Sequence, residues 1–137
     1  MADPMRAQRG LLDTSVVIDL EKIAVARLPQ EIAVSSLTMA ELAAGPHATD
    51  DPRERGRRQD RLQRAEAVFE PLPFDAEAAR TYGRIYAVVA AAGREARGAR
   101  AVDLLIAATA AAEGLPLYTR NGVDFQALDG VVDVVVV

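Results

Sequence analysis

Short runs of apolar residues alternate along this chain with longer segments in which apolar residues recur every three or four positions. The short runs, at residues 11–12, 32–34, 117–119 and 131–137, predict strands, the last of them interrupted only by Asp133. After Asp13, the β-branched residues 16–18 leave two alternatives open, a continued strand or a helix to Leu20. The pattern therefore predicts strands that are separated by helical segments.

The helices are expected where a capping side chain precedes helical periodicity and where glycine or proline ends it. They run from Ser36 or Thr38 to residues 45–46, from Asp51-Pro52 to about Phe69, from Asp75 to Gly93, and from residue 101 to Gly114. The last of these is apolar all round, which indicates a buried helix. Asn121-Gly122 predicts a turn.

Strands separated by helices predict an α/β fold with a central, mainly parallel sheet covered by helices on both faces, a three-layer α/β/α architecture. The chain has no internal repeat and no linker, so we expect one domain over residues 10–137 after a mobile tail of residues 1–9. Its length of 137 residues is enough to bury a core of its own.

Four acidic residues stand in apolar or strand-end surroundings. Asp103 is the only charged residue in the apolar segment 101–112, and a carboxylate buried there must be paired, protonated or bound to a cation. Asp13 and Asp124 follow two strands, and Glu41 lies on a flanking helix. Ligands bind at the carboxyl ends of parallel strands, so we expect these acids to meet there. Converging carboxylates repel one another unless a divalent cation such as Mg²⁺ joins them.

Each acid also has a structural interpretation that the sequence leaves open. The two acids that follow strands could cap the segments after them, and Glu41 could form a capping box with Thr38. Asp103 could form an ion pair with Arg100, three residues earlier. Capping alone does not explain four acids in apolar surroundings, so a metal site is the interpretation that we favour.

Composition narrows the chemistry further. The absence of cysteine excludes disulfides, thiolate nucleophiles and cysteine-ligated metals, and it suits a reducing cytoplasm. The single histidine, His47, excludes catalysis by a histidine pair, and no Gly-x-Ser-x-Gly or phosphate-binding Gly-Lys-Ser/Thr loop is present. The first residues lack the apolar run of a signal peptide, and no run approaches about 18 apolar residues. We therefore expect a cytoplasmic protein with no membrane partner.

Four segments together resemble a known family. Leu-Leu-Asp-Thr-Ser-Val-Val-Ile at 11–18, Met-Ala-Glu-Leu-Ala-Ala-Gly at 39–45, Val-Asp-Leu-Leu-Ile-Ala-Ala at 102–108 and Thr-Arg-Asn-Gly-Val-Asp-Phe at 119–125 occur in the order and spacing of a PIN domain. Within that family the chain is similar to the small VapC-type toxins of type II toxin–antitoxin pairs. The resemblance covers residues 10–137.

The resemblance implies a ribonuclease that depends on Mg²⁺ or Mn²⁺, cuts RNA as the toxin of the pair, and is neutralised by a VapB-type antitoxin. It also implies a homodimer. It puts Asp13, Glu41, Asp103 and Asp124 on the family's acidic positions, with Asp13 and Asp103 as leading metal ligands. Thr14, Ser15 and Asn121 would give polar support. Many relatives carry Asp where this chain has Asn121, so either Asp124 or Asn121 completes the site.

Arginine supplies 15 of the 16 basic residues and is unevenly distributed. A stripe at helical spacing, Arg53, Arg57, Arg61 and Arg64, is either a solvated helix face or a phosphate-binding surface. Arg97, Arg100 and Arg120 lie beside the acidic motifs in the sequence, and we expect them to bind RNA.

Two other functions remain to be compared with the ribonuclease. A signalling receiver domain also carries an acid at a strand end, but it needs a lysine at a late strand end, and the only lysine here is Lys22. A catalytically inactive PIN-like module that binds nucleic acid or protein would keep the fold without turnover. Calorimetry with a divalent ion separates that module from the nuclease.

Overall fold

The computed structural model describes residues 7–94 and 99–137. At its centre lies a sheet of four strands in the order β2-β1-β3-β4, in which every neighbouring pair is parallel. The strands are β1 (Arg9–Leu12), β2 (Glu31–Ala33), β3 (Leu117–Thr119) and β4 (Val134–Val136). Because all four run the same way, their carboxyl ends share one edge of the sheet.

Helices connect the strands. The α-helices are α1 (Thr14–Ile18), α2 (Ser36–Ala44), α3 (Pro52–Val68), α4 (Ala76–Ala91) and α5 (Ala99–Ala112). Short 3₁₀ helices are η1 (Leu20–Lys22), η2 (Val25–Arg27), η3 (Gly45–Ala48) and η4 (Gly122–Leu128). Asp51 and Asp75 cap α3 and α4 with their side chains, as the sequence predicted.

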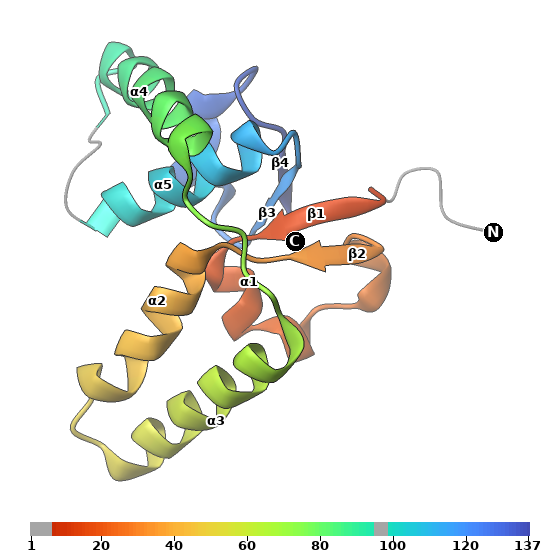
Figure 1. Ribbon diagram of the computed structural model, residues 1–137, viewed down its shortest axis with the longest axis vertical. Helices are drawn as coiled ribbons and strands as arrows, with labels where there is room; N and C mark the ends of the chain where they lie inside the picture. The colour runs from red at the N-terminus through yellow and green to blue at the C-terminus, as the bar shows by residue number, and fades with distance from the viewer. Residues whose placement is uncertain (1–6, 95–98) are drawn as a thin grey trace.

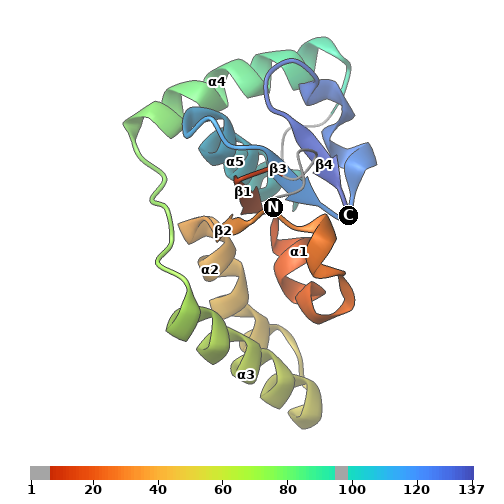
Figure 2. The ribbon, with the colours of Figure 1, turned by 90° about the vertical axis from the view of Figure 1, so that its right-hand side faces the viewer.

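The helices cover both faces of the sheet, which confirms the predicted three-layer architecture. Figures 1 and 2 show α4 and α5 on one face and α1, α2 and α3 on the other. Neighbouring strand residues point to opposite faces. Leu11 therefore packs into the core beneath α4 and α5, whereas Leu12 packs into the second core with Val16. This alternation gives the small domain two apolar cores, one on each side of a four-stranded sheet.

The structure decides between the two alternatives for the segment after Asp13, and it changes the predicted start of α2. The segment after Asp13 is a helix, because the Asp13 carboxylate accepts a hydrogen bond from the backbone N–H of Thr14 at 2.9 Å and β1 ends there. Ser35, rather than Ser36 or Thr38, caps α2, since its hydroxyl accepts from the backbone N–H of Leu37 at 2.9 Å. The capping box between Thr38 and Glu41 is therefore not formed.

The two ends of the fold also differ from expectation. The last strand is confined to β4, because the N–H groups of Val131 and Val132 donate to the Leu128 carbonyl at 2.9 and 3.2 Å and close the turn after η4. Within the expected tail, the carbonyls of Ala7 and Gln8 accept from the amides of residues 30 and 31, at 3.0 and 2.7 Å. Pairing with β2 thus begins before Arg9, and residues 1–6 lie outside the described part.

In the part of the chain that the structure describes, no helix is long and apolar enough to cross a membrane.

Two glycines provide a matched test of the packing around β1. A Cβ atom on Gly10 would lie 2.5 Å from Cε1 of Tyr118 and 3.1 Å from Cβ of Pro29, whereas one on Gly56 in α3 would meet nothing within 4 Å. Gly10→Ala should destabilise the protein by about 1–3 kcal/mol through overpacking. Gly56→Ala should stabilise it by about 0.5–1 kcal/mol, because glycine is a poor residue for a helix interior. Urea unfolding measures both, and a Gly10→Ala protein as stable as wild type would contradict the close packing.

Candidate active site

Asp13 is the most buried acid of the site. It follows β1 directly and is only 3% exposed. Its Oδ2 accepts hydrogen bonds from the hydroxyls of Ser15 at 3.0 Å and Thr119 at 2.9 Å, and its Oδ1 accepts from the Thr14 N–H. Burial raises the pKa of Asp13, and the negative charge of Asp124 adds to that rise, while these three hydrogen bonds oppose it. The carboxylate is therefore fixed in position but poorly solvated.

Glu41 reaches the same edge from α2. Its Oε1 accepts a hydrogen bond from the Thr14 hydroxyl at 2.6 Å, and the hydroxyl oxygens of Thr14 and Thr38 lie 3.0 Å apart. A hydroxyl has one proton to donate, so the Thr14 proton goes to Glu41 and Thr38 donates to Thr14. The buried Thr14 hydroxyl thus holds one oxygen of an otherwise exposed carboxylate, and the buried Thr38 hydroxyl in turn holds Thr14.

Asp103, on α5, interacts with all the other acids. Partial burial raises its pKa to about 6, and the like charges of Asp13, Glu41 and Asp124 contribute to the same shift, while Arg100 opposes it. The four acids predicted from the sequence therefore act on one another at one place. Asp103 is half-buried, which leaves its carboxyl accessible from that edge.

Asp124 lies in the first turn of η4 with 41% of its side chain exposed. Its partner is Arg100, whose Nη2 is 3.5 Å from Oδ1 of Asp124 and whose Nη1 donates to the Asp124 carbonyl at 2.6 Å. The ion pair that the sequence offered between Arg100 and Asp103 is thus made with Asp124 instead. Asn121 contributes its backbone N–H, which donates to the Thr119 hydroxyl at 3.0 Å, and its side chain does not cap η4.

The donor set fits a hard divalent cation in its chemistry. Carboxylate oxygens are the ligands that Mg²⁺ and Mn²⁺ prefer. Burial first, and the like charges of neighbouring acids second, raise the pKa values of Asp13 and Asp103, and a cation would stabilise their charged forms. Within residues 7–94 and 99–137, however, no three His, Asp or Glu side chains are gathered closely enough to hold an ion as they stand. In the present arrangement an ion would therefore have at most two of these side chains as direct ligands, with water completing its coordination.

The three arginines expected to bind RNA have different environments. Arg97 belongs to residues 95–98, which lie outside the described residues. Arg120 is half-buried, its Nε is 3.4 Å from Oδ2 of Asp19, and its backbone N–H donates to the Ser15 hydroxyl at 3.1 Å. Arg100, as described above, is paired with Asp124. Arg100 and Arg120 therefore both have intramolecular carboxylate partners.

The arginine-rich helix α3 is largely bound to its own surroundings. Arg57 and Arg58 both pair with Glu54, at 2.6 and 3.0 Å, and Arg64 pairs with Glu21 at 3.1 Å. Arg58 also donates to the Gly45 carbonyl at 2.9 Å. These contacts favour the solvated, salt-bridged helix face over a dedicated phosphate-binding surface.

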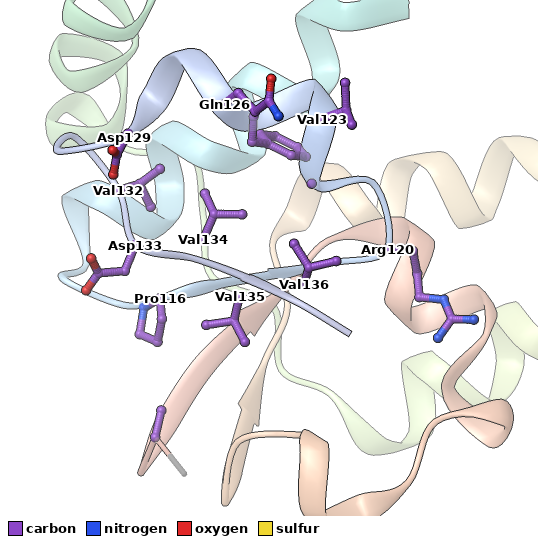
Figure 3. Close-up of a pocket in the computed structure, with 13 residues that line it drawn as sticks. Pro116, Arg120, Val123, Gln126, Asp129, Val132, Asp133, Val134, Val135 and Val136 are labelled. Carbon is purple, nitrogen blue, oxygen red and sulfur yellow. The ribbon is translucent and has the colours of Figure 1, made fainter. Parts of the chain in front are cut away.

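A cavity of about 1060 Å³ opens between η4 and the edge strand β4 (Figure 3). Its lining includes Val134, Val136 and Phe125, and Arg120 at its rim points away from these valines. None of the four acids lines it. Its lining mixes these apolar side chains with Gln126, Asp129 and Asp133, and because it holds none of the four acids that influence one another, the acidic edge is the candidate active site.

Two site residues were not identified from the sequence as part of the acidic site. Thr119 ends β3 at the same edge as Asp13 and is fully buried, and its position at a strand end is the signal that could have revealed it. Thr38 is fully buried on α2, where the sequence suggested only a cap. Its role depends on how α2 packs against α1, which no local pattern shows.

Comparison with known proteins supports the same grouping. The PIN domain model matches residues 10–131. Over 131 residues the chain is 38% identical to Ribonuclease VapC5 of Mycobacterium tuberculosis (strain ATCC 25618 / H37Rv), which covers 93% of each protein. It is 39% identical over 102 residues to Ribonuclease VapC8 of the same strain, covering 74% of this chain and 89% of VapC8.

A solved structure agrees with these relatives. The fold matches the crystal structure of VapBC-5, a member of the VapBC family of toxin–antitoxin systems from Mycobacterium tuberculosis, with a TM-score of 0.81 and 38% identity. The match covers 95% of this chain and 99% of that chain.

The raised pKa of Asp103, caused first by burial and then by the neighbouring acids, predicts a pH-dependent stability. The folded Asp103 keeps its proton up to a pH of about 6, whereas an unfolded chain loses it near the ordinary pKa of 3.8, so the metal-free protein should lose stability as pH rises through this interval. Asp103→Asn should remove that loss and be more stable than wild type at neutral pH by about 1–2 kcal/mol, allowing for partial solvent screening. Urea unfolding in EDTA across the interval measures the difference.

The control for that experiment is Asp60→Asn, which removes the same charge from the exposed surface of α3 and should change stability by less than about 0.5 kcal/mol. A wild-type stability that does not fall relative to Asp103→Asn would show that folding does not raise the pKa of Asp103, through burial or through like charges.

Proposed function

This chain belongs to the PIN domain family, and from that premise we propose that it is a divalent-metal-dependent endoribonuclease that acts as the toxin of a toxin–antitoxin pair. The observation that carries the proposal is the cluster of four acids, in which burial, together with the like charges of Asp13, Glu41 and Asp124, raises the pKa of Asp103. The family resemblance stated from the sequence is confirmed by the matched relatives. Two of them, VapC5 and VapC8, are named ribonucleases.

In this proposal Asp13 and Asp103 hold the ion, which is Mg²⁺ or Mn²⁺, and Glu41 and Asp124 complete the site. When bound, the ion supplies a Lewis acid that stabilises negative charge on the phosphate and on the leaving oxygen. Asp13 suits a ligand role because three hydrogen bonds fix its orientation. The side chain of Asn121 is exposed and does not cap η4, so it would be available to bind the substrate or a water.

Glu41 and Asp124 would orient the water that attacks phosphorus. Thr14 binds one oxygen of Glu41, which leaves the second oxygen available as an acceptor for that water. The chain has no cysteine and no histidine in the acidic cluster, so direct attack by water is the mechanism that its residues support.

RNA would approach across the exposed part of this edge. Of the arginines predicted to bind RNA, Arg120 has 31% of its side chain exposed beside the site, and it is the phosphate contact that we retain. The lack of cysteine is compatible with action in the cytoplasm, where RNA is available.

Removing the leading ligands should abolish cleavage without unfolding the protein. Asp13→Asn and Asp103→Asn keep the side-chain shape but remove the charge that holds the cation, and each should lower RNA cleavage by more than about 100-fold. Cleavage of a labelled RNA with Mg²⁺ or Mn²⁺ measures the loss, and circular dichroism checks the fold. Asp60→Asn is the matched control, and EDTA should stop the wild-type enzyme. Near-normal cleavage by either site variant would show that the assigned site is wrong.

Two protein partners follow from the proposed function. A VapB-type antitoxin would silence the site by placing an arginine among the carboxylates, where a guanidinium binds two oxygens at once. The contact points expected for its apolar residues are Leu42 and Tyr82. Leu42 is buried in the core with Leu12 and Val16, so of the two only the partly exposed Tyr82 is open to apolar residues of the antitoxin, whose burial there would add affinity. A second copy of the chain would form a homodimer through exposed apolar side chains such as Tyr86 on α4.

The metal and an arginine from the antitoxin should compete for the same oxygens. Mg²⁺ at constant ionic strength should weaken the complex between the chain and its antitoxin modestly, and Asp103→Asn should remove that effect of Mg²⁺. Sedimentation of the labelled chain at several concentrations measures this affinity and also the mass of the chain alone. If the affinity changes neither with Mg²⁺ nor with Asp103→Asn, the antitoxin binds away from the acidic site. If the chain alone has a monomer mass at every concentration, it does not form the homodimer.

A further inference from the structure

Two arginines reach η4: Arg94, which follows α4, and Arg100, in the first turn of α5. Arg94 donates from Nη1 to the Val123 carbonyl at 3.0 Å, and Arg100 donates from Nη1 to the Asp124 carbonyl at 2.6 Å. The second Nη of Arg94 also lies 3.4 Å from Oε1 of Gln126. Consecutive carbonyls of η4 are thus bound by two cationic side chains, a pair of contacts that we call the arginine clamp.

Arg100 contacts Asp124 twice. Besides its hydrogen bond to the carbonyl, its Nη2 lies 3.5 Å from the Oδ1 carboxylate oxygen. The guanidinium is planar and its donors have a fixed geometry. When one donor binds the Asp124 carbonyl, the position of the other donor beside the Asp124 carboxylate is therefore set as well. Only 27% of the Arg100 side chain is exposed, which leaves little of it for an external phosphate.

In the described part of the chain, Asp124 lacks the hydroxyl hydrogen bonds that hold Asp13 and Glu41. Asp13 is held by three hydrogen bonds and Glu41 by the Thr14 hydroxyl. Asp124 instead sits in a 3₁₀ helix, whose hydrogen-bond geometry is poorer than that of an α-helix. Among the residues that the structure describes, Arg100 is the only cation paired with its carboxylate.

We propose that Arg100, assisted by Arg94, is a positioning residue that holds η4 so that the Asp124 carboxylate faces the other acids. The sequence had suggested an RNA contact for Arg100. The inference rests on the proposed function only in that Asp124 belongs to the catalytic site. The arginine clamp would order η4 whether or not the protein cleaves RNA.

Substitutions at Arg100 separate positioning from RNA binding. Arg100→Gln should lower kcat by about 10- to 100-fold and leave KM within about twofold, because misplacing a catalytic group slows the reaction without weakening substrate binding. Arg100→Lys should not restore kcat, since an ammonium group lacks the guanidinium fork. In an Asp124→Asn background, Arg100→Gln should change kcat by less than about twofold, because the positioned group is already gone.

Controls and a second readout make the test independent of activity. Arg80→Gln removes an arginine that pairs with Glu77 on the surface of α4 and should leave kcat unchanged. Arg94→Gln should reproduce part of the Arg100→Gln effect. In hydrogen–deuterium exchange, amides of residues 123–128 should exchange about tenfold faster in Arg100→Gln, while those of α2 keep their wild-type rates.

Three results would overturn the positioning role. They are a raised KM with unchanged kcat in Arg100→Gln, restoration of activity by Arg100→Lys together with a shallower salt dependence in Arg100→Gln, or unchanged exchange in η4. The first two would make Arg100 an RNA contact. If the wild-type protein cleaves no RNA with either metal ion, the proposed function fails, and the exchange rates still decide whether the clamp orders η4.

Discussion

The parallel alignment of β1 with β3 is the constraint on which the site depends. It joins segments more than one hundred residues apart, through the hydrogen bond from the Asp13 N–H to the Tyr118 carbonyl at 2.8 Å. The same alignment places the Thr119 hydroxyl 2.9 Å from the Asp13 carboxylate. Without this pairing Asp13 would be a buried acid with fewer partners, and α1 and η4 would not flank a common edge.

Electrostatic repulsion is the cost of that convergence. The segments after β1 and β3, together with helices α2 and α5, bring four acids to one region, where burial first and the like charges of the other acids second raise the pKa of Asp103. Repulsion of this kind lowers stability in the absence of a cation, and functional sites often accept such a loss. The two apolar cores on either side of the sheet supply the stability that allows it.

Most arginines that the structure describes near the motifs have partners within the chain. On α3 they bind Glu54 and the carbonyls of η3, and near the site Arg100 and Arg120 bind Asp124 and Asp19. In this arginine-rich, lysine-poor chain, these guanidinium groups therefore form contacts between segments of the same chain. That use follows from its several donors, which bind carbonyls and carboxylates together.

The sequence alone determined the α/β class, the helix starts at Asp51 and Asp75, and the four acids, because capping and periodicity are local and acids in apolar surroundings are visible without a structure. Only the tertiary structure decided which partners those acids have. Thr38 contacts Glu41 only through Thr14. Arg100 forms its ion pair with Asp124, although Asp103 is closer to it in the sequence. Hydrogen bonds and ion pairs between distant segments depend on how the helices pack. The number of residues between two side chains does not determine how far apart they lie in the folded chain.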